Sequence, residues 1–196
     1  IDSAKSDNAS IKFKVLCQSS NNGIYGALNM GIGALEADVV FILHSDDWYE
    51  PKAAENVISV FDKNPEADIV IGRAMFYKNG RDASPVLKNN RSFSLFPVLH
   101  PVIHPACFVK RDVYGRIGNF NENYLVSADY DFTYRCYKSG INFLKCHEHL
   151  VNVQKGGFGW KNKNIAMCEN LRIGLKHGRN NIFPKLAYLL RVLLNR

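Results

Sequence analysis

The sequence predicts an α/β protein in which helices flank a mostly parallel central sheet, and two observations support this class. Residues 39–43 form a continuous β-branched and apolar run, which is typical of a strand buried on both faces of a parallel sheet. Residues 67–77 form a second run, and Pro51 is well placed as the first residue of a helix extending to about Asp62. A strand, a helix and a strand in this order indicate a right-handed crossover, which places ligands beyond the carboxyl ends of the strands.

The remaining elements continue this alternating order. A short strand is expected at residues 13–16 and a helix at 25–35, and helices should resume near 129–139 and 165–176. The stretch 78–105 has little pattern and is too long for an ordinary connection. We therefore expect it to form a loop that faces the substrate.

The composition indicates one main globular domain. The chain has 196 residues, of which 46% are hydrophobic and 22% charged, enough for one sizeable core. Its five cysteines are odd in number and widely spaced, which argues against a disulfide framework or a zinc site and favours the cytoplasm. No window approaches the roughly 18 to 20 apolar residues of a membrane-spanning helix, and no signal peptide is recognisable. Because the chain starts at Ile1 rather than Met, we expect that an N-terminal piece is missing.

The net charge of +7 is concentrated in the last quarter of the chain. A positive field attracts nucleic acid, phosphorylated substrates and anionic lipids alike, and a basic protein that is merely soluble is the simple alternative. Residues 181–196 also show a narrow polar stripe and a broad apolar face on a helical wheel. Such a helix packs in a core or, with its basic residues, lies on a membrane surface.

Two adjacent carboxylates, Asp46 and Asp47, directly follow the strand expected at 39–43. One interpretation is a turn or a helix cap that uses short acceptors. The other is a divalent cation site, because Mg²⁺ or Mn²⁺ binds carboxylate oxygens together with substrate phosphates. Such a cation would also compensate the two neighbouring negative charges.

A second acidic cluster, SADYDF, contains Asp129 and Asp131. On a helix these two residues lie roughly 200° apart, so their carboxylates cannot serve one point. They should therefore have different roles, and a helix N-cap is the structural alternative for Asp129.

Four segments together resemble the bacterial family 2 glycosyltransferases, which have the GT-A fold. In order, they are NNGIYGALNMGI, ADVVFILHSDDWYEP, HPACFVKRDVYGRIGNFNENYLVSADYDFTYR and KGGFG. The resemblance implies a GT-A domain over residues 1–180, to which the basic amphipathic helix 181–196 is appended. It also implies that the family's first strands, which hold the nucleobase, are missing from this chain.

The resemblance assigns roles to the two acidic clusters. SDD corresponds to the family's DxD-type motif, so Asp46 is expected near the ribose or the metal, and Asp47 is expected to hold Mn²⁺ or Mg²⁺ on the donor diphosphate. Trp48 would wall the sugar site, with ordinary packing as the alternative. Asp129 corresponds to the catalytic base and Asp131 to a supporting or structural residue. One base suffices for an inverting displacement.

Further substrate contacts are implied at Asn29 and His104. The chain keeps Asn29 where the family motif has it, whereas Gly26 and Met30 replace the acid and the lysine that are common there. His104 matches a recurrent histidine that could contact the acceptor or the diphosphate, although a structural role is the alternative.

The segment Lys155, Gly156 and Gly157 is expected to close on the donor phosphates. Its glycines give backbone freedom, and its lysine and amide groups are donors. A simple glycine turn is the alternative.

The function implied is a metal-dependent, inverting transfer of a sugar from a nucleotide-sugar donor to an acceptor hydroxyl. Surface polysaccharide biosynthesis (O-antigen, capsule or exopolysaccharide) on a lipid-linked saccharide acceptor would place the protein in the cytoplasm, with peripheral contact to the inner membrane face and no nucleic acid partner. The alternative from another class is a non-catalytic remnant or partner subunit that keeps the fold as a binding surface. A two-metal nuclease is disfavoured because Asp46, Asp47 and Asp129 lack the further ligands of such sites.

Overall fold

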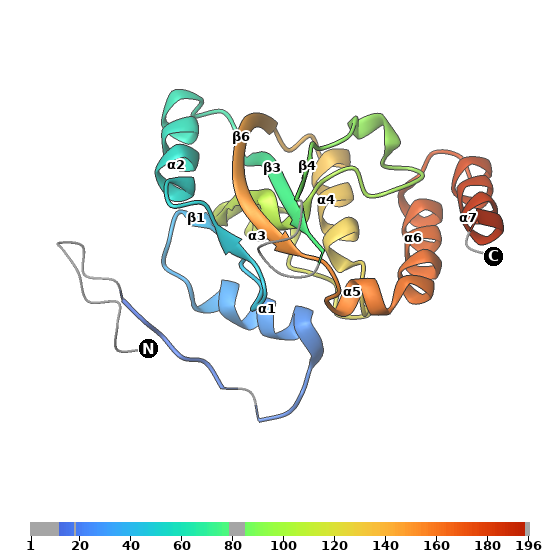
Figure 1. The fold of residues 1–196 in the computed structure, drawn as a ribbon, viewed down its shortest axis with the longest axis horizontal. Helices are drawn as coiled ribbons and strands as arrows, with labels where there is room; N and C mark the ends of the chain where they lie inside the picture. Colours follow the sequence, from blue (N-terminus) through green and yellow to red (C-terminus); the bar gives the residue numbers. More distant parts are fainter. Residues whose placement is uncertain (1–11, 18, 79–84, 195–196) are drawn as a thin grey trace.

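In the part of the chain that the structure describes, a six-stranded sheet forms the centre (Figure 1). The computed structural model describes residues 12–17, 19–78 and 85–194. The strand order is β1-β5-β3-β6-β2, and β4 pairs with β3 beside this path. The strands are β1 (Val39–Val40), β2 (Trp48–Tyr49), β3 (Ile69–Tyr77), β4 (Val86–Lys88), β5 (Cys107–Lys110) and β6 (Phe143–Gln154).

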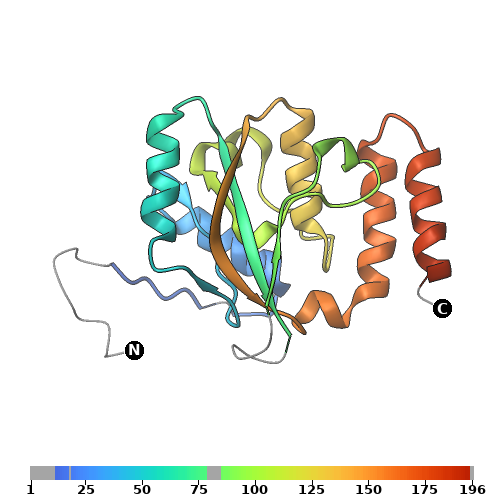
Figure 2. The ribbon, with the colours of Figure 1, turned by 45° about the horizontal axis from the view of Figure 1, so that its top comes forward.

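The helices cover the sheet on two sides. They are α1 (Gly23–Ala34), α2 (Ala53–Lys63), α3 (Arg111–Ile117), α4 (Ala128–Lys138), α5 (Phe158–Lys161), α6 (Lys163–His177) and α7 (Ile182–Leu194), with short 3-10 turns η1 (Phe93–Leu95) and η2 (His104–Ala106). Figures 1 and 2 show α2 on one side of the sheet and α4, α6 and α7 in succession on the other, with α7 outermost. None of the helices in the described ranges has the length and apolar content that crossing a membrane requires.

Alternation of side chains along β3 builds a core on each side of the sheet. Ile69 and Ile71 belong to the larger cluster, and Val70 packs with Val57 and Phe61 of α2. Successive residues of a strand point to opposite faces, so a continuous apolar run is what burial on both faces requires.

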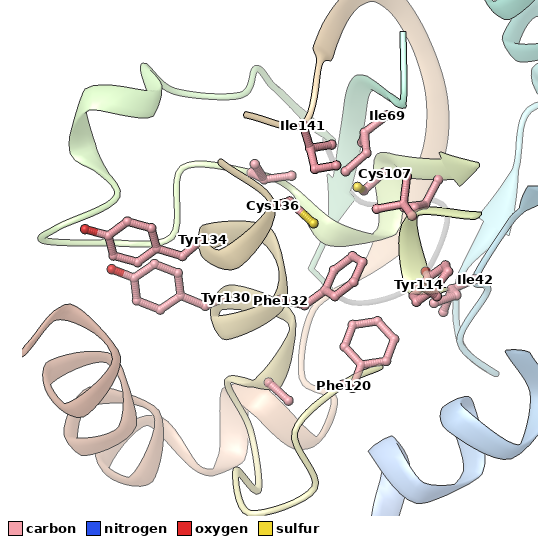
Figure 3. Close-up of a cluster of buried hydrophobic side chains, with 14 of the residues drawn as sticks. Ile42, Ile69, Cys107, Tyr114, Phe120, Tyr130, Phe132, Tyr134, Cys136 and Ile141 are labelled. Atoms are coloured by element: carbon pink, nitrogen blue, oxygen red, sulfur yellow. The ribbon is translucent and has the colours of Figure 1, made fainter. Parts of the chain in front are cut away.

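α4 is held on two sides, which fixes the position of its first turn. Figure 3 shows Phe132 directed toward Tyr114 and Phe120, while Tyr130 points away from them. The Phe132 ring stacks on Tyr114 with centroids 4.9 Å apart. The Tyr130 hydroxyl donates to the Phe96 carbonyl in the segment after η1. A rigidly packed helix can present a side chain from its N-terminal turn in a defined direction.

The predicted α/β class is confirmed, but the expectation of a mostly parallel sheet is wrong for the part of the chain that the structure describes. β3 and β6 pair in parallel, whereas β1–β5, β3–β5, β3–β4 and β2–β6 are antiparallel. β1 and β3 run in the same direction, as the crossover through α2 predicts, but β5 lies between them and runs oppositely. The crossover pattern is local in sequence, and it does not reveal a strand inserted from far along the chain.

Several element boundaries also differ from the prediction. Residues 13–16 are extended and exposed without forming a strand, because no described strand lies beside them to supply hydrogen bonds. The strand at 39–43 is restricted to β1, and α2 begins two residues after Pro51. The stretch 78–105 contains β4, η1 and the start of η2, and its residues 79–84 lie outside the described residues. α1, α4 and α6 begin and end within two residues of their predicted bounds.

Candidate active site

One pocket of about 520 Å³ collects most of the acidic residues singled out in the sequence. Its walls come from α1, the turn after β1, η2, the first turn of α4 with the segment before it, the end of β6 with the segment after it, and α5. The lining residues are Ile24, Tyr25, Leu28, His44, Ser45, Asp46, Asp47, His104, Pro105, Leu125, Val126, Asp129, Val153, Gln154, Gly157, Phe158, Gly159 and Trp160. The fold thus brings both acidic clusters, His104 and Gly157 to one cavity.

The carboxylate pair lies on a tight turn that leads from β1 to β2. The Asp47 amide donates to the His44 carbonyl at 3.1 Å, and Asp47 Oδ1 accepts a hydrogen bond from the Gln154 amide at 3.0 Å. A Cβ on Gly157 would lie only 3.3 Å from Asp46 Oδ2, so a residue without a side chain allows this close approach. The segment after β6 is therefore packed directly against the pair.

The surroundings of Asp47 disfavour its negative charge. Burial raises the pKa of Asp47, the hydrogen bond from Gln154 lowers it, and the adjacent Asp46 raises it again, so the pKa is above its ordinary value. The protein alone does not fully compensate this charge.

Asp129 lies in the first turn of α4 and faces the same cavity. Its Oδ1 accepts a hydrogen bond from the Tyr130 amide at 2.8 Å and lies 3.5 Å from the Tyr25 hydroxyl. Its Oδ2 is 3.6 Å from His100 Nδ1. About a quarter of the side chain (23%) is exposed, so a substrate hydroxyl in the pocket can reach the carboxylate.

Two histidines, the buried His104 and the partly buried His100, stand near Asp129 in their neutral form at neutral pH. Burial lowers the pKa of His104 to about 4, although the negative charge of Asp129 opposes this shift. The same two causes act on His100, whose pKa is also lowered. His100 Nε2 is 3.0 Å from Thr133 Oγ1, which fixes the ring beside α4. Neutral imidazoles can donate or accept a hydrogen bond here without adding charge.

Asp131 points away from the pocket. It is completely buried, and its carboxylate accepts hydrogen bonds from Arg135 Nε and His177 Nε2, each at 2.8 Å. Burial alone would raise the pKa of Asp131, but these hydrogen bonds outweigh it and lower the pKa. Asp131 therefore joins α4 to the end of α6, and the two aspartates do face different surroundings.

Asn29 and Trp48 are not among the residues that line this pocket. The Asn29 side chain accepts a hydrogen bond from the Phe120 backbone amide at 3.0 Å and donates to the Phe120 carbonyl and to Glu122 Oε1. It therefore ties α1 to the loop after α3. The Trp48 ring packs on Tyr77, with centroids 5.0 Å apart. These contacts hold the scaffold around the site.

Of the predicted phosphate-binding segment, Gly157 alone lines the pocket. The Lys155 amide donates to the Tyr77 carbonyl at 2.8 Å, and this bond anchors the end of β6 to β3. Gly156 has a φ of 109°, a conformation that favours glycine, and it turns the chain back toward Asp46.

Three residues near the site were not predicted from the sequence: Tyr25, His100 and Glu169. Tyr25 belongs to the GIY segment, and its hydroxyl donates to the Val126 carbonyl at 2.5 Å. His100 lies in the weakly patterned stretch before η2. Its position four residues before His104 was the one feature of the sequence that pointed to it. Glu169 is a buried acid in the middle of α6, and nothing in the local sequence distinguishes it from an exposed one.

The donor set fits a divalent cation that takes part of its ligands from a substrate. Within the described ranges, no group of three or more His, Cys, Asp and Glu side chains has the geometry of a metal cage. Asp46 and Asp47 nevertheless offer oxygen donors on the pocket wall, and the raised pKa of Asp47 is the behaviour of a carboxylate that a cation would stabilise. Mg²⁺ and Mn²⁺ commonly bind through one or two carboxylates and substrate phosphates.

The profile of the family described as Glycosyl transferase family 2 matches residues 2–118, more than half of the chain. This range contains Asp46, Asp47 and His104 but ends before Asp129. A PGL/p-HBAD biosynthesis glycosyltransferase of Mycobacterium bovis is 26% identical over 161 residues, which cover 81% of this chain and 60% of that protein. An uncharacterized glycosyltransferase of Rickettsia prowazekii is 28% identical over 140 residues, covering 67% of this chain and 44% of that protein. The chain thus spans about 60% of the length of the mycobacterial relative.

Solved structures show the same architecture. The crystal structure of S. aureus TarS 1-349 superimposes with a TM-score of 0.57 at 13% identity, covering 87% of this chain and 51% of that one. The same TarS fragment in complex with UDP-GlcNAc also gives a TM-score of 0.57, with 87% and 52% covered. This likeness confirms the expected GT-A fold. With a profile match over more than half its length, the chain belongs to glycosyl transferase family 2.

Proposed function

We propose that the protein transfers a sugar from a nucleoside diphosphate donor to an acceptor hydroxyl with inversion at the anomeric carbon. The observation that carries this proposal is the pocket lined by both the Asp46–Asp47 pair and Asp129. The pair suits the diphosphate side of a donor, and Asp129 suits the hydroxyl that attacks it. Further support comes from the family match and from the UDP and UDP-GlcNAc complexes of TarS.

In the proposed reaction, Asp129 acts as the general base. Its carboxylate takes the proton of the acceptor hydroxyl, whose oxygen forms the new bond to the anomeric carbon. The bond from that carbon to the diphosphate oxygen breaks on the opposite face, and the nucleoside diphosphate leaves with the bonding electrons. A single displacement of this kind needs one base within about 3 Å of the hydroxyl and no covalent intermediate.

Asp46 and Asp47 would hold Mg²⁺ or Mn²⁺ at the other side of the pocket. When bound, the cation neutralises negative charge on the departing diphosphate. The Gln154 amide holds Asp47 Oδ1 in place at 3.0 Å, and Gly157 keeps the chain close to Asp46 Oδ2. The hydrogen bond from Gln154 therefore fixes Asp47 before substrate binds, and Gly157 leaves room for Asp46 beside it.

The first experiment measures whether donor binding depends on the cation and on Asp47. Titration calorimetry of UDP and GDP should show binding with Mn²⁺ or Mg²⁺ and at least a tenfold weaker affinity in EDTA, as expected when one strong charge interaction is lost. Asp47→Ala should remove the dependence on metal. Asp62→Ala, an exposed residue on α2, is the matched control and should behave as wild type.

The proposed role of the pair is wrong if wild type binds the nucleotide equally well with and without metal. It is also wrong if Asp47→Ala, in the presence of metal, binds the nucleotide as tightly as wild type does. Loss of binding in Asp62→Ala as well would indicate a general loss of structure instead.

We also propose that the acceptor is lipid-linked and that α7 rests on a membrane surface. The polar stripe of α7 faces the protein: Pro184 is buried against Gly174 of α6, and Arg191 Nη2 donates to the Val98 carbonyl at 3.2 Å. The opposite side exposes its apolar side chains, which are Ile182, Phe183, Leu186, Leu189, Leu190, Leu193 and Leu194. Figure 2 shows this helix as the outermost one. The exposure of these side chains shows that this side of α7 is not covered by the described part of the chain.

The charge around α7 favours an anionic lipid surface as the occupant of its apolar side. No acidic residue follows Glu169 in the sequence, whereas Arg172, Lys176, Arg179 and Lys185 are exposed. Apolar side chains that enter the interface and basic residues that contact lipid headgroups act together in peripheral helices.

A further inference from the structure

Glu169 is a buried carboxylate that binds the backbone of a neighbouring segment. Its side chain extends from the middle of α6 and is 6% exposed. Oε1 accepts a hydrogen bond from the Leu125 amide at 2.6 Å, and Oε2 accepts from the Val126 amide at 2.9 Å and the Ser127 amide at 2.8 Å. Hydrogen bonds to an ionised acceptor are roughly twice as strong as neutral ones. One side chain thus fixes three consecutive residues that are more than 40 positions away along the chain.

The segment 125–127 connects directly to the pocket and to the start of α4. Leu125 and Val126 line the cavity, and Ser127 is the N-cap residue of α4. The Tyr25 hydroxyl binds the Val126 carbonyl at 2.5 Å from the other side of the segment. Its amide groups are therefore held by α6 and its carbonyl by α1.

Asp129 follows this segment after one residue. Its carboxylate position depends on where α4 starts, because the Asp129 side chain is in the first turn and is bound there by the Tyr130 amide. A shift of residues 125–127 would move Asp129 relative to Asp47, whose carboxylate is held separately by the Gln154 amide.

We propose that Glu169 is a positioning residue that holds Asp129 in its reactive orientation. The inference rests on the proposed role of Asp129 as base. It gives α6 a part in the reaction, although Glu169 is not among the residues that line the pocket. Glu169 acts through the backbone of residues 125–127 and does not contact substrate.

The test substitutes Glu169→Gln, which keeps the size of the side chain and replaces one acceptor oxygen by a donor. The amide group can satisfy some of the three backbone donors but must face at least one of them with an N–H. We expect turnover to fall on the order of 10-fold to 100-fold, the effect that a misplacement of about 1 Å has on a reacting group. The dissociation constant for UDP with Mn²⁺ should stay within about twofold of the wild-type value, because the substitution displaces Asp129 and leaves the Asp46–Asp47 side of the pocket in place. Glu148→Gln, an exposed residue of β6, is the matched control and should leave both values unchanged.

A double-mutant cycle with Asp129→Asn separates positioning from general stability. If Glu169 acts through Asp129, Glu169→Gln should reduce turnover much less in the Asp129→Asn background than in wild type. Equal losses in both backgrounds would overturn the proposal. So would unchanged turnover in Glu169→Gln, or a loss of turnover accompanied by an equal loss of UDP affinity.

A readout independent of turnover keeps this inference separable from the proposed function. Amide hydrogen exchange at Leu125, Val126 and Ser127 should be accelerated on the order of tenfold in Glu169→Gln, as the loss of a charged hydrogen bond implies. Unchanged exchange would overturn the inference even if the protein proved inactive. A different measurement tests the proposed function: full turnover in the Asp129→Asn single variant would show that Asp129 is not the base.

Discussion

Asp129 and Asp131 stand one residue apart, and the structure gives them opposite environments. Asp129 is partly exposed in the pocket, whereas Asp131 is buried and bound by Arg135 and His177. Helical geometry explains the difference, because side chains two residues apart on an α-helix point about 200° away from each other. Identical side chains can thus have a chemical role and a structural role within one turn of α4.

Replacing Asp131 should destabilise the fold. Asp131→Asn leaves the cations of Arg135 and Lys176 without their buried partner, and removal of one member of a buried pair costs about 3 kcal/mol. The free energy of unfolding, measured in urea at pH 7, should fall by about this amount. Asp112→Asn, whose carboxylate is exposed beside Arg116, is the control and should change it by less than about 0.5 kcal/mol.

The pH dependence of this effect has a definite sign. The pKa of Asp131 is lowered in the folded protein, so its contribution is present above the unfolded-state pKa of about 4. It is lost as the pH falls through the lower pKa of the folded state. The difference in stability between wild type and Asp131→Asn should therefore shrink below pH 4, and a difference that stays constant to pH 2 would contradict the ion-pair explanation.

At the scale of the elements, α6 and α7 extend the domain beyond its sheet. α6 contacts α4 through His177, and it contacts the segment 125–127 beside the pocket through Glu169. α7 packs on α6 where Pro184 meets Gly174, its Arg191 binds the Val98 carbonyl, and its leucines are exposed. A broad apolar face in the sequence did not distinguish core packing from membrane contact, because both bury such a face. The structure shows that this face is not packed against the described part of the chain.

Membrane binding should depend on the outward face of α7. Leu189→Glu together with Leu193→Glu places two charges on that face, away from the contacts of Pro184 and Arg191, and should release the protein from anionic vesicles. Co-sedimentation with vesicles of phosphatidylglycerol and phosphatidylcholine measures this release. Ile58→Glu, at an exposed apolar position of α2, is the matched control. If the double variant sediments as well as wild type, α7 is not the membrane contact.

The longer helices could be predicted from sequence, whereas the short helices α3 and α5 and the strand pairing were not predicted. α2 and α7 have a clear apolar periodicity over several turns, which is a local signal. β1 and β2 are two residues long and exist because β5 and β6 lie beside them. Their partners come from more than 60 residues away in the chain, so short-range patterns do not specify them.

At the scale of the whole molecule, the candidate site is assembled from distant segments. Tyr25 reaches Asp129 across 104 positions, and Asp47 reaches Gln154 across 107. The sequence identified the acidic residues because each cluster is local and has a recognisable type. It could not identify His100 or Glu169, whose significance lies in long-range contacts that only the folded chain creates.

The role of Asp129 can be tested by the turnover of Asp129→Asn with a nucleotide-sugar donor. We expect a reduction on the order of 10² to 10⁴, the usual contribution of a general base, with the donor dissociation constant nearly unchanged. The product formed by wild type should show an inverted anomeric configuration by NMR. If Asp129→Asn keeps more than about a tenth of wild-type turnover, which lies outside that range, Asp129 is not the base and the proposed mechanism is wrong.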